Sequence, residues 1–370
     1  MNKVVVAEYI TEIVDNGAES LIRDYAIMMD RSKIEPIVIV HRYHPESANE
    51  KLLRENNVKI IALYPHWNLP VRIIKKMTEK WYIPFKLNRI IKKEKIQVVH
   101  AHMRVLKYLT RVSKDVRLLY TCHNIAENFV GISEPREHQA AKLLIENNNL
   151  QMIALHDEMR KDINKIFSIN STVVVRNGVC FSRFQNVNQT KEQIREKIGV
   201  PKNKFVIGHV GKFFAQKNHE YLIDVFSEVI KKREDAFLLL VGAGELLEKI
   251  TDKIKRLELE NNVLILSHRS DIPELLKAMD VFLFPSLFEG LPVSLIEAQA
   301  VGLRCVCSDT INPEAFASEN TIALSIKSSP SEWANVILDD SIKGKAVVGL
   351  DEYNMETEIK KLERLYLNGV

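Results

Sequence analysis

The sequence predicts an α/β fold made of two Rossmann-like domains, each with a doubly wound parallel sheet. Short apolar runs alternate with amphipathic helical patterns, which is typical of parallel strands covered by helices on both faces. This alternation is interrupted once, where Arg183 to Gly199 is polar and irregular and then helical, and it restarts at Lys204. The chain has 370 residues, enough for two domains of ordinary size. We therefore place one domain at residues 1–184 and a second at residues 185–353.

The first domain opens with an apolar run, and similar runs recur to its end. Asn16 and Gly17 form a turn after the first run, and an amphipathic helix follows as far as Met29. The expected strands are Val4 to Ala7, Ile37 to Val40, Val58 to Ile61, Val98 to His100, Arg117 to Thr121, Gln151 to Leu155 and Thr172 to Val175.

The second domain repeats the alternation. The expected strands and helices are, in order, Phe205 to Val210, Asn218 to Lys232, Ala236 to Val241, Gly244 to Leu257, Val263 to Leu266, Ile272 to Met279 and Val281 to Phe284. After Cys307 the pattern weakens, until Asp351 to Val370 reads as a charged helix with an apolar side that includes Tyr366.

One stretch of the second domain, Phe284 to Asp309, predicts a ligand site. A buried strand ends in a Pro/Gly-rich loop with Glu289 at its tip, and a helix is expected from Val293 to Ala300, with Pro292 at its first position and Gly302 after its end. A helix start at the carboxyl end of a strand suits a phosphate. Glu289 and Glu297, one turn into the helix, add carboxylates that accept hydrogen bonds from sugar hydroxyls.

Two lysines form a second candidate group. A strand ends at Gly211, and Lys212 and Lys217 flank the short loop that leads into the next helix. As point charges, the two ammonium groups can clamp a diphosphate without requiring a fixed geometry.

Histidines follow two neighbouring strands of the first domain. His100 and His102 end one strand, and His123 with Asn124 follows the next. We expect these side chains to be exposed at the sheet edge rather than packed in the core, where each can bond a sugar hydroxyl or stabilise negative charge. Glu127 and Glu137 are candidate acceptor-side groups, and the alternative, which we expect, is that they are solvated loop residues.

The strand–loop–helix–strand block with its Glu-x7-Glu pair resembles the retaining GT-B glycosyltransferases of family four (glycosyl transferases group 1). The loop from Val210 to His219 and the Val-Gly-x-Gly turn at Val241 to Gly244 are similar to other motifs of that family. The resemblance is closest to transferases of bacterial exopolysaccharide or capsule synthesis. It implies two Rossmann-like domains facing across a cleft, with the acceptor mainly on the first. It also implies that a last helix, residues 354–370, packs back on the first domain.

The resemblance also implies roles for individual residues. Glu289 and His123 would orient the donor sugar, Glu297 would bind the ribose, and Lys212 and Lys217 would stabilise the diphosphate. The donor-binding set that it implies is Gly17, Lys212, Lys217, Arg269, Glu289, Gly290, Leu291, Pro292, Val293 and Glu297, with Arg269 contacting the base through its backbone.

Three departures from the family pattern affect turns. Asn16 replaces the first glycine of a Gly-Gly-x-Glu turn, which leaves Gly17 for close approach to donor phosphates or acceptor. Asn218 replaces the common glycine after Lys217, which alters loop shape more than charge. Cys180 replaces an aspartate after the turn at Asn177 and Gly178. This hinge-side turn is consistent with a contact to the donor and equally consistent with a plain turn.

The implied reaction moves a hexose from a nucleoside diphosphate sugar, UDP-linked, to a glycan or polyprenyl-linked acceptor, with retention at the anomeric carbon. No cofactor and no metal are expected, because no Asp-x-Asp motif follows a strand. Two alternatives stay open: a non-catalytic nucleotide-sugar-binding subunit of a glycosyltransferase complex, and a GT-B epimerase acting on UDP-N-acetylglucosamine.

Composition and charge limit the classes of partner and the cellular location that we expect. The net charge of +4 is uneven, because the chain through Arg183 is basic and the remainder acidic. No nucleic-acid-binding motif accompanies the basic half, so we expect no nucleic-acid partner. The four cysteines contain no Cys-x-x-Cys pair, and the amino terminus lacks a signal-peptide core, which predicts a cytoplasmic protein.

Val71 to Lys95 concentrates positive charge beside Trp81, Tyr82 and Phe85. Basic residues with interfacial aromatics predict contact with an anionic membrane surface, and a solvated helix face is the alternative. We expect Pro84 to break any single long helix here.

Overall fold

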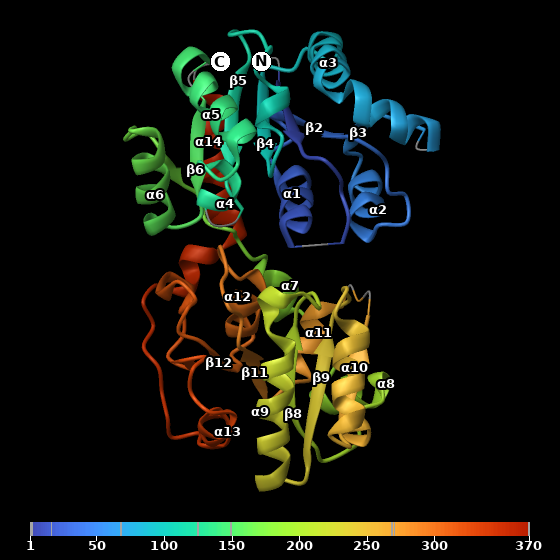
Figure 1. Cartoon of the computed structure of the whole chain (residues 1–370), viewed down its shortest axis with the longest axis vertical. Helices are drawn as coiled ribbons and strands as arrows, with labels where there is room; N and C mark the ends of the chain where they lie inside the picture. The colour runs from blue at the N-terminus through green and yellow to red at the C-terminus, as the bar shows by residue number, and fades with distance from the viewer. Residues whose placement is uncertain are drawn as a thin grey trace. The chain divides into compact units, whose positions relative to one another are not determined.

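The computed structural model describes residues 3–15, 17–66, 69–123, 126–148, 150–267, 269 and 271–368. The chain forms two compact units. The first holds Met1–Gly178 and Glu356–Val370, and the second holds Val179–Met355. The last helix of the chain therefore belongs to the first unit, as the red ribbon of α14 (Met355–Leu367) shows (Figure 1).

The division between the units falls slightly before the predicted boundary at residues 184 and 185. The reason is packing, because α7 (Phe181–Gln185) contacts α11 (Ile272–Lys277) and α12 (Val293–Ala300) of the second unit. Backbone bonds join the two ends of the second unit, from Val179 N to Tyr353 O at 2.6 Å and from Met355 N to Val179 O at 3.1 Å.

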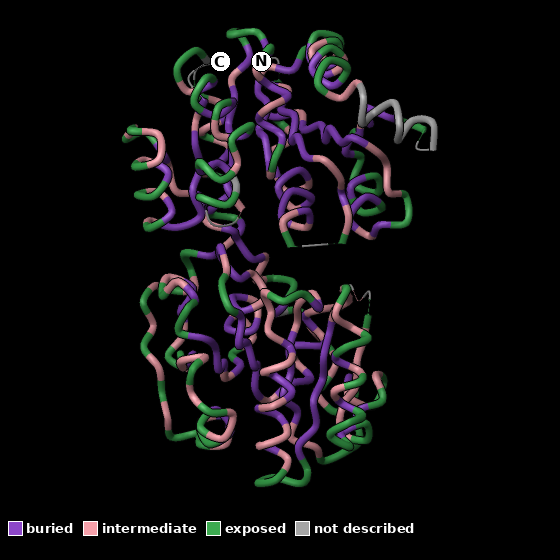
Figure 2. Tube along the Cα trace, viewed as in Figure 1, coloured by how far each residue is buried: buried purple, intermediate pink, exposed green. Residues whose placement is uncertain are grey.

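The first unit contains a seven-stranded parallel sheet in the order β3-β2-β1-β4-β5-β6-β7. Its central strands β1 and β4 are almost wholly buried, and buried segments appear purple in Figure 2. The strands are β1 (Val4–Tyr9), β2 (Ile34–Val40), β3 (Lys59–Ala62), β4 (Val98–His102), β5 (Arg117–Thr121), β6 (Gln151–Ala154) and β7 (Val173–Val174).

Besides α14, the described residues of the first unit form six α-helices and one 3-10 turn. They are α1 (Gly17–Met28), α2 (Ala48–Glu55), α3 (Leu69–Lys93), η1 (Leu106–Tyr108), α4 (Ala126–Val130), α5 (Pro135–Asn148) and α6 (Asp157–Phe167). None of the helices in the described ranges has a stretch long and apolar enough to cross a lipid bilayer.

The expectation that Pro84 interrupts a long helix is wrong, because α3 continues through it. Proline removes one backbone hydrogen bond, but here the helix is held from outside. Ile83 and Leu87 are fully buried, and Asn88 Nδ2 donates to Pro84 O at 3.0 Å. Tertiary packing therefore outweighs the local penalty.

The second unit contains a six-stranded parallel sheet in the order β10-β9-β8-β11-β12-β13. Its strands are β8 (Phe205–Val210), β9 (Ala236–Val241), β10 (Val263–Leu266), β11 (Val281–Phe284), β12 (Arg304–Ser308) and β13 (Thr321–Leu324). Its other elements are α8 (Lys191–Ile198), η2 (Ala215–Lys217), α9 (His219–Lys232), α10 (Leu247–Arg256), η3 (Glu260–Asn262), η4 (Pro313–Ala315), α13 (Pro330–Leu338) and η5 (Leu350–Tyr353).

The sequence predicted the bounds of β8 to β11 correctly but missed β13 and α13. The strand β13 is a short edge strand with an exposed Ala323, so its pattern is weak. The helix α13 carried a readable signal, because Ser329 and Glu332 form a capping box at its start.

Candidate functional site

Each sheet has a topological switch point, where consecutive connections leave in opposite directions. In the second sheet it lies between β8 and β11, which pair directly. The loops that leave the carboxyl ends of these two strands carry Lys212 and Lys217 after β8 and Glu289 after β11. Switch points are the usual ligand sites of open α/β sheets.

Lys217 and Glu289 form an ion pair that joins the two loops. Lys217 Nζ lies 2.6 Å from Glu289 Oε1, and the side chains are only 16% and 8% exposed. Gln216 Nε2 donates a hydrogen bond of 3.1 Å to Oε2 of the same carboxylate. It also donates one of 2.9 Å to the backbone oxygen of Phe288. Lys217 Nζ also lies 4.7 Å from the ring centre of Phe284. The pair is therefore held in place from several directions.

The loop after β8 packs tightly against the loop after β9. Phe213 N donates to Ala243 O at 3.0 Å. A Cβ atom on Gly242 would lie 2.0 Å from Gly211 O, and one on Gly244 would lie 2.6 Å from Phe213 O. The Val-Gly-x-Gly turn is thus a packing requirement of two strand ends.

Lys212, the second predicted clamp residue, lies at the start of this loop. Its Nζ is 5.3 Å from the ring centre of Phe214, whose side chain is exposed. Both lysines therefore lie close to an aromatic ring, at distances that suit a cation–π contact.

The amino terminus of α12 faces this edge of the sheet. Pro292 occupies the N-cap with non-helical dihedral angles, φ −78° and ψ 91°, and its side chain makes no capping hydrogen bond. The prediction that Pro292 takes the first helical position is therefore wrong by one residue. Gly302, with φ 77°, ends the helix as predicted.

Gly290 and Leu291 are buried before this helix start, and Val293 is half-buried. Glu297 is half-buried one turn into α12. The helix start, Glu289 and Glu297 therefore belong to one short segment next to the lysine loop.

Two further predicted residues lie elsewhere, Arg269 in the second unit and Gly17 in the first. Arg269 donates from Nε to Asp271 Oδ1 at 2.7 Å, and this partner raises the pKa of the guanidinium. Gly17 begins α1, and a Cβ added to it would meet no atom within 4 Å. No backbone constraint seen here requires glycine at that position. Asn16, Asn124 and His268 lie outside the described residues.

The switch point of the first sheet, between β1 and β4, holds a buried polar cluster. Glu8 on β1 and His100 and His102 on β4 are all fully buried. His102 Nε2 lies 2.7 Å from Glu8 Oε2, and His100 Nδ1 lies 3.2 Å from the same oxygen. The expectation that His100 and His102 are exposed is therefore wrong, because a buried carboxylate compensates their polarity inside the sheet layer.

Tyr366 of α14 closes this cluster. Its hydroxyl donates to Glu8 Oε1 at 2.8 Å and lies 2.6 Å from His100 Nδ1. His100 Nε2 lies 2.7 Å from the hydroxyl of Thr121. Every polar atom of His100 thus has a partner.

His123, directly after β5, extends the cluster. Its Nε2 lies 2.9 Å from His102 Nδ1, and its Nδ1 has no hydrogen-bond partner within the described residues. Burial lowers the pKa of His102 to about 4 and that of His123 well below its usual value. Burial alone would raise the pKa of Glu8, but the neighbouring histidines outweigh it and lower that pKa. Glu8 is therefore ionised and His102 and His123 are neutral at pH 7.

The donor types of Glu8, His100 and His102 also suit a zinc ion, and their ligand atoms lie within 4.8 Å of one another. In the structure these atoms are bonded to each other, to Tyr366 and to Thr121, so an ion would have to replace existing hydrogen bonds. The arrangement fits a hydrogen-bond network better than a metal site.

Neither Glu8 nor the polar role of Tyr366 was predicted from the sequence. A glutamate inside the run Val-Val-Val-Ala-Glu-Tyr is a readable signal, since a carboxylate in a buried strand requires partners. Tyr366 gave no such signal, because its spacing only marks the apolar side of a helix.

Glu137 is a further correction, because it is buried rather than solvated. It accepts a bond from Leu106 N at 2.9 Å and pairs with Lys107 at 3.0 Å, while burial raises its pKa. It holds the short turn η1 in place.

Asn177, in the turn just before the boundary between the two units, is also buried.

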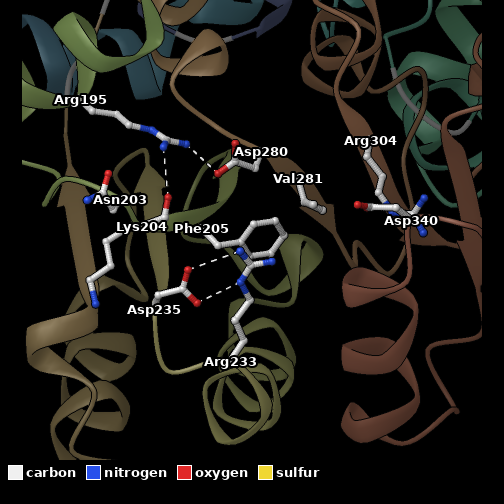
Figure 3. Close-up of a pocket in the computed structure, with 10 residues that line it drawn as sticks. All are labelled: Arg195, Asn203, Lys204, Phe205, Arg233, Asp235, Asp280, Val281, Arg304 and Asp340. Carbon is white, nitrogen blue, oxygen red and sulfur yellow. Dashed lines mark hydrogen bonds and ion pairs between the residues drawn. The ribbon is translucent and has the colours of Figure 1, made fainter.

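A recess of about 480 Å³ lies at the opposite end of the second sheet (Figure 3). It is lined at the start of β8 and β11 by Phe205 and Val281. Ion pairs lie within it, between Arg195 and Asp280 at 2.7 Å and between Arg233 and Asp235 at 3.0 Å. This recess contains none of the predicted site residues.

Comparison with known proteins gives two family matches. "Glycosyltransferase Family 4" matches residues 15–183, and "Glycosyl transferases group 1" matches residues 190–340. A UDP-Gal:alpha-D-GlcNAc-diphosphoundecaprenol alpha-1,3-galactosyltransferase of Escherichia coli is 31% identical over 234 residues, which are 60% of this chain and 60% of that protein. The capsular polysaccharide biosynthesis glycosyltransferase CapH of Staphylococcus aureus is 24% identical over 308 residues, 78% of this chain and 82% of its own.

Solved structures resemble both units together. Anabaena Alr3699/HepE in complex with UDP and glucose has a TM-score of 0.79 at 19% identity, covering 98% of this chain and 99% of that one. WaaG, a glycosyltransferase involved in lipopolysaccharide biosynthesis, has a TM-score of 0.72 at 16% identity, covering 98% and 100%. These likenesses show a shared fold.

Proposed function

Because the chain belongs to the glycosyltransferases of group 1 and family 4 and has their GT-B fold, we propose that it transfers a sugar from a nucleoside diphosphate sugar to an acceptor hydroxyl. The bond between the anomeric carbon and the diphosphate breaks, and a bond from that carbon to the acceptor oxygen forms. The acceptor proton passes to an oxygen of the leaving diphosphate.

The ion pair between Lys217 and Glu289 carries this proposal. In a nucleoside diphosphate sugar the anomeric carbon is bonded to the β-phosphate. A cation on the diphosphate and a carboxylate on a sugar hydroxyl must therefore lie close together. Lys217 Nζ and Glu289 Oε1 are 2.6 Å apart at the switch point of the second sheet. A carboxylate alone would repel a diphosphate, whereas this pair offers one group to each part of the donor.

Charge stabilisation is the main chemical work of such a site, since negative charge grows on the leaving diphosphate. Lys217, Lys212 and the uncapped start of α12 at Gly290 to Val293 supply positive charge and N–H donors. Glu297 would bind the ribose hydroxyls, and the backbone at Arg269 would face the base.

We propose UDP as the nucleotide and retention at the anomeric carbon. The UDP of the HepE complexes supports the first point, and membership of family four supports the second. With no carboxylate assigned as a nucleophile, the donor's own phosphate oxygen would serve as the base. No cofactor takes part in this scheme.

The acceptor is proposed to be a glycan or a polyprenyl-linked sugar of a polysaccharide or capsule pathway. The name of the Escherichia coli relative, which acts on a diphosphoundecaprenol-linked sugar, supports a lipid-linked acceptor. The name of CapH supports the capsule setting.

A lipid-linked acceptor is consistent with the proposed contact of α3 with an anionic membrane surface on the cytoplasmic side. Trp81 and Phe85 of α3 are 63% and 68% exposed, which is unusual for large aromatic side chains. Lys80, Arg89 and Lys92 are exposed on the same helix. The side chains of residues 69–77 lie outside the described part of the chain.

Release of UDP separates this function from its two alternatives. The protein is incubated with a panel of UDP-sugars, with and without a polyprenyl diphosphate sugar acceptor, and products are identified by mass spectrometry. A transferase releases UDP only as the acceptor gains mass. A binding subunit retains the nucleotide sugar without turnover, and an epimerase converts UDP-N-acetylglucosamine without using the acceptor. Either of the last two results would reject the proposal.

A further inference from the structure

Three side chains form a hydrogen-bonded line across the switch point of the first sheet. Glu8 Oε2 lies 2.7 Å from His102 Nε2, and His102 Nδ1 lies 2.9 Å from His123 Nε2. They come from β1, from β4 and from the loop after β5, which are neighbours in the sheet. Glu8 and His102 are fully buried, so water does not compete for these bonds.

Proton positions along this line follow from simple hydrogen-bond rules. An ionised carboxylate only accepts, so His102 must donate its Nε2–H to Glu8. A neutral imidazole has one N–H, which leaves a lone pair on His102 Nδ1. That lone pair needs a donor, so His123 presents its Nε2–H to it. The remaining nitrogen of His123, Nδ1, is then a lone-pair acceptor.

This acceptor is unsatisfied within the described residues, although it is buried. A lone pair cannot bond a phosphate oxygen, which is itself an acceptor, but it can accept a hydroxyl proton. We propose that Glu8 and His102 are positioning residues that hold His123 with Nδ1 as the acceptor for a hydroxyl group of a sugar substrate. The identity of this ligand as a sugar rests on the proposed function, whereas the proton arrangement does not.

The proton arrangement is tested by NMR on the wild-type protein without substrate. Histidine-selective ¹⁵N labelling distinguishes a protonated from an unprotonated ring nitrogen, and a His123→Gln variant assigns the signal. The protein contains its own references of opposite tautomer. His138 Nδ1 lies 2.9 Å from Val130 O and His209 Nδ1 lies 2.9 Å from Leu283 O, and a carbonyl can only accept.

The expected spectrum at pH 7 shows His102 and His123 protonated at Nε2 alone and the two references protonated at Nδ1. A coupling between His123 Nε2 and His102 Nδ1 across their hydrogen bond is also expected. If His123 carries its proton on Nδ1, or is doubly protonated at this pH, the inference is wrong. Only the assignment of the signal uses a variant, and the measurement itself requires no enzymatic activity.

Kinetics test the link to the sugar. Monodeoxy and monodeoxyfluoro analogues of the UDP-sugar that is turned over are compared, because fluorine can accept a hydrogen bond but cannot donate one. At one hydroxyl position, both the deoxy and the deoxyfluoro analogue should have a kcat/KM about tenfold lower than the native sugar in the wild-type enzyme. In His123→Ala the native sugar and both analogues should have the same kcat/KM. Rescue by fluorine at that position would show that His123 donates, and would overturn the inference.

Glu8→Gln tests the positioning role. The carboxylate of Glu8 has two acceptor oxygens for its neighbours, whereas the carboxamide has only one. The hydrogen bond that orients His102 should therefore be weaker in this variant. We expect kcat/KM for the native sugar to fall about tenfold and the deoxy analogue to lose much less. Thr121→Val is the control, since it removes another buried bond, the 2.7 Å contact with His100, without touching this line. Equal effects of both variants on both sugars would mean a merely structural role.

The two proposals fail separately. Absence of sugar transfer together with the expected tautomers would reject the function and leave the positioning line standing. Transfer activity with the opposite tautomers would reject the positioning line alone.

Discussion

Lys217 and Glu289 neutralise each other in a place where both side chains are largely shielded from water. Such a pair costs more to break than an exposed one, because the remaining partner is left as a buried charge. The pair therefore has a structural role, because it connects two loops, in addition to its proposed role in binding the donor. Kinetic variants at this position have to separate these two effects.

The first prediction compares two single substitutions at the proposed donor site. Glu297→Ala should weaken binding of the UDP-sugar by about 1.5–3 kcal/mol, because ribose hydroxyls lose a charged acceptor. Lys217→Ala should lower kcat more than it weakens binding of UDP, because the diphosphate gains charge in the transition state. Calorimetric titration with UDP and steady-state kinetics measure the two effects.

Lys231→Ala is the matched control, since this lysine also forms a 2.6 Å ion pair, with Glu228, but is exposed on α9. It should leave both quantities unchanged. Wild-type kinetics in Glu297→Ala and Lys217→Ala would mean that the assigned site is wrong.

The second prediction concerns metal ions. Lys212 and Lys217 supply positive charge on the loop after β8, so a divalent cation is not needed to neutralise the diphosphate. Activity should persist in EDTA, and Lys212→Ala with Lys217→Ala should lower it. Complete loss in EDTA with recovery in magnesium or manganese would count against the lysine clamp.

The third prediction follows from His219, whose ring stacks on Phe213 with centres 4.3 Å apart. Both ring nitrogens are buried and lack hydrogen-bond partners within the described residues. Burial, together with the charge of Lys217, lowers the pKa of His219 to about 4. The unfolded chain therefore binds a proton below about pH 6.5 that the folded chain does not bind until about pH 4.

Stability contributed by this neutral histidine is complete above pH 6.5 and is lost as the pH falls toward 4. Between pH 7.5 and 5 the loss should be about 2 kcal/mol for this residue. His219→Phe keeps the ring stack and should reduce the difference between urea denaturation free energies at the two pH values by that amount. His66→Gln, at an exposed histidine, should not change the difference. An unaltered difference in His219→Phe would contradict the burial argument.

At the scale of single elements, α3 is the most unusual helix in the described part of the chain. It keeps large aromatic side chains exposed beside positive charge, and cation–π contacts organise them. Arg111 lies 5.2 Å from the ring centre of Trp81, and Lys86 lies 5.4 Å from that of Tyr82. A basic helix that presents tryptophan and phenylalanine suits the interface of an anionic membrane.

The fourth prediction is that the protein sediments with liposomes in proportion to their anionic lipid content. Binding should fall as salt is raised, since these interactions are screened. Trp81→Ala with Phe85→Ala should weaken it, and so should changing Lys75, Lys76 and Lys80 to glutamate. Changing the exposed Lys231 and Lys249 of the second unit to glutamate is the charge-matched control and should have little effect. Equal binding to neutral and anionic vesicles would leave α3 as an ordinary solvated helix.

At the scale of the whole molecule, the second unit is a continuous segment inserted between two parts of the first. Its ends are hydrogen-bonded to each other through Val179, Tyr353 and Met355. The first unit, by contrast, needs both parts of the chain. Ile359, Leu362 and Tyr366 of α14 are buried in it, and Glu358 of α14 accepts a bond of 2.8 Å from Arg176 N.

The fifth prediction follows from this asymmetry. Residues 179–355 expressed alone should unfold in a single cooperative urea transition, whereas residues 1–178 alone should not, because they leave the α14 face and Glu8 uncovered. A fusion of residues 1–178 through a short flexible linker to residues 356–370 should restore cooperative unfolding, since Arg176 and Glu358 are in contact. Cooperative unfolding of residues 1–178 without α14 would contradict this account.

Features of this protein that depend on local pattern were predictable from the sequence. Apolar runs such as Val281–Phe284 and helix signals such as Gly302 located elements to the residue, because strand burial and left-handed glycine are local properties. The spacing of Lys217 and Glu289 within their own motifs also suggested the donor site. Only the tertiary structure joined the two as an ion pair, because strand order decides which loops meet.

The burial of His100 and His102 could be seen only in the tertiary structure. Local sequence placed His100 and His102 at the end of a strand and predicted exposure, but Glu8 and Tyr366, distant along the chain, enclose them. Pro84 was misread for the same reason, since packing of Ile83 and Leu87 holds α3 together from outside. Burial and partner choice depend on contacts between residues far apart in sequence, and no local pattern encodes those contacts.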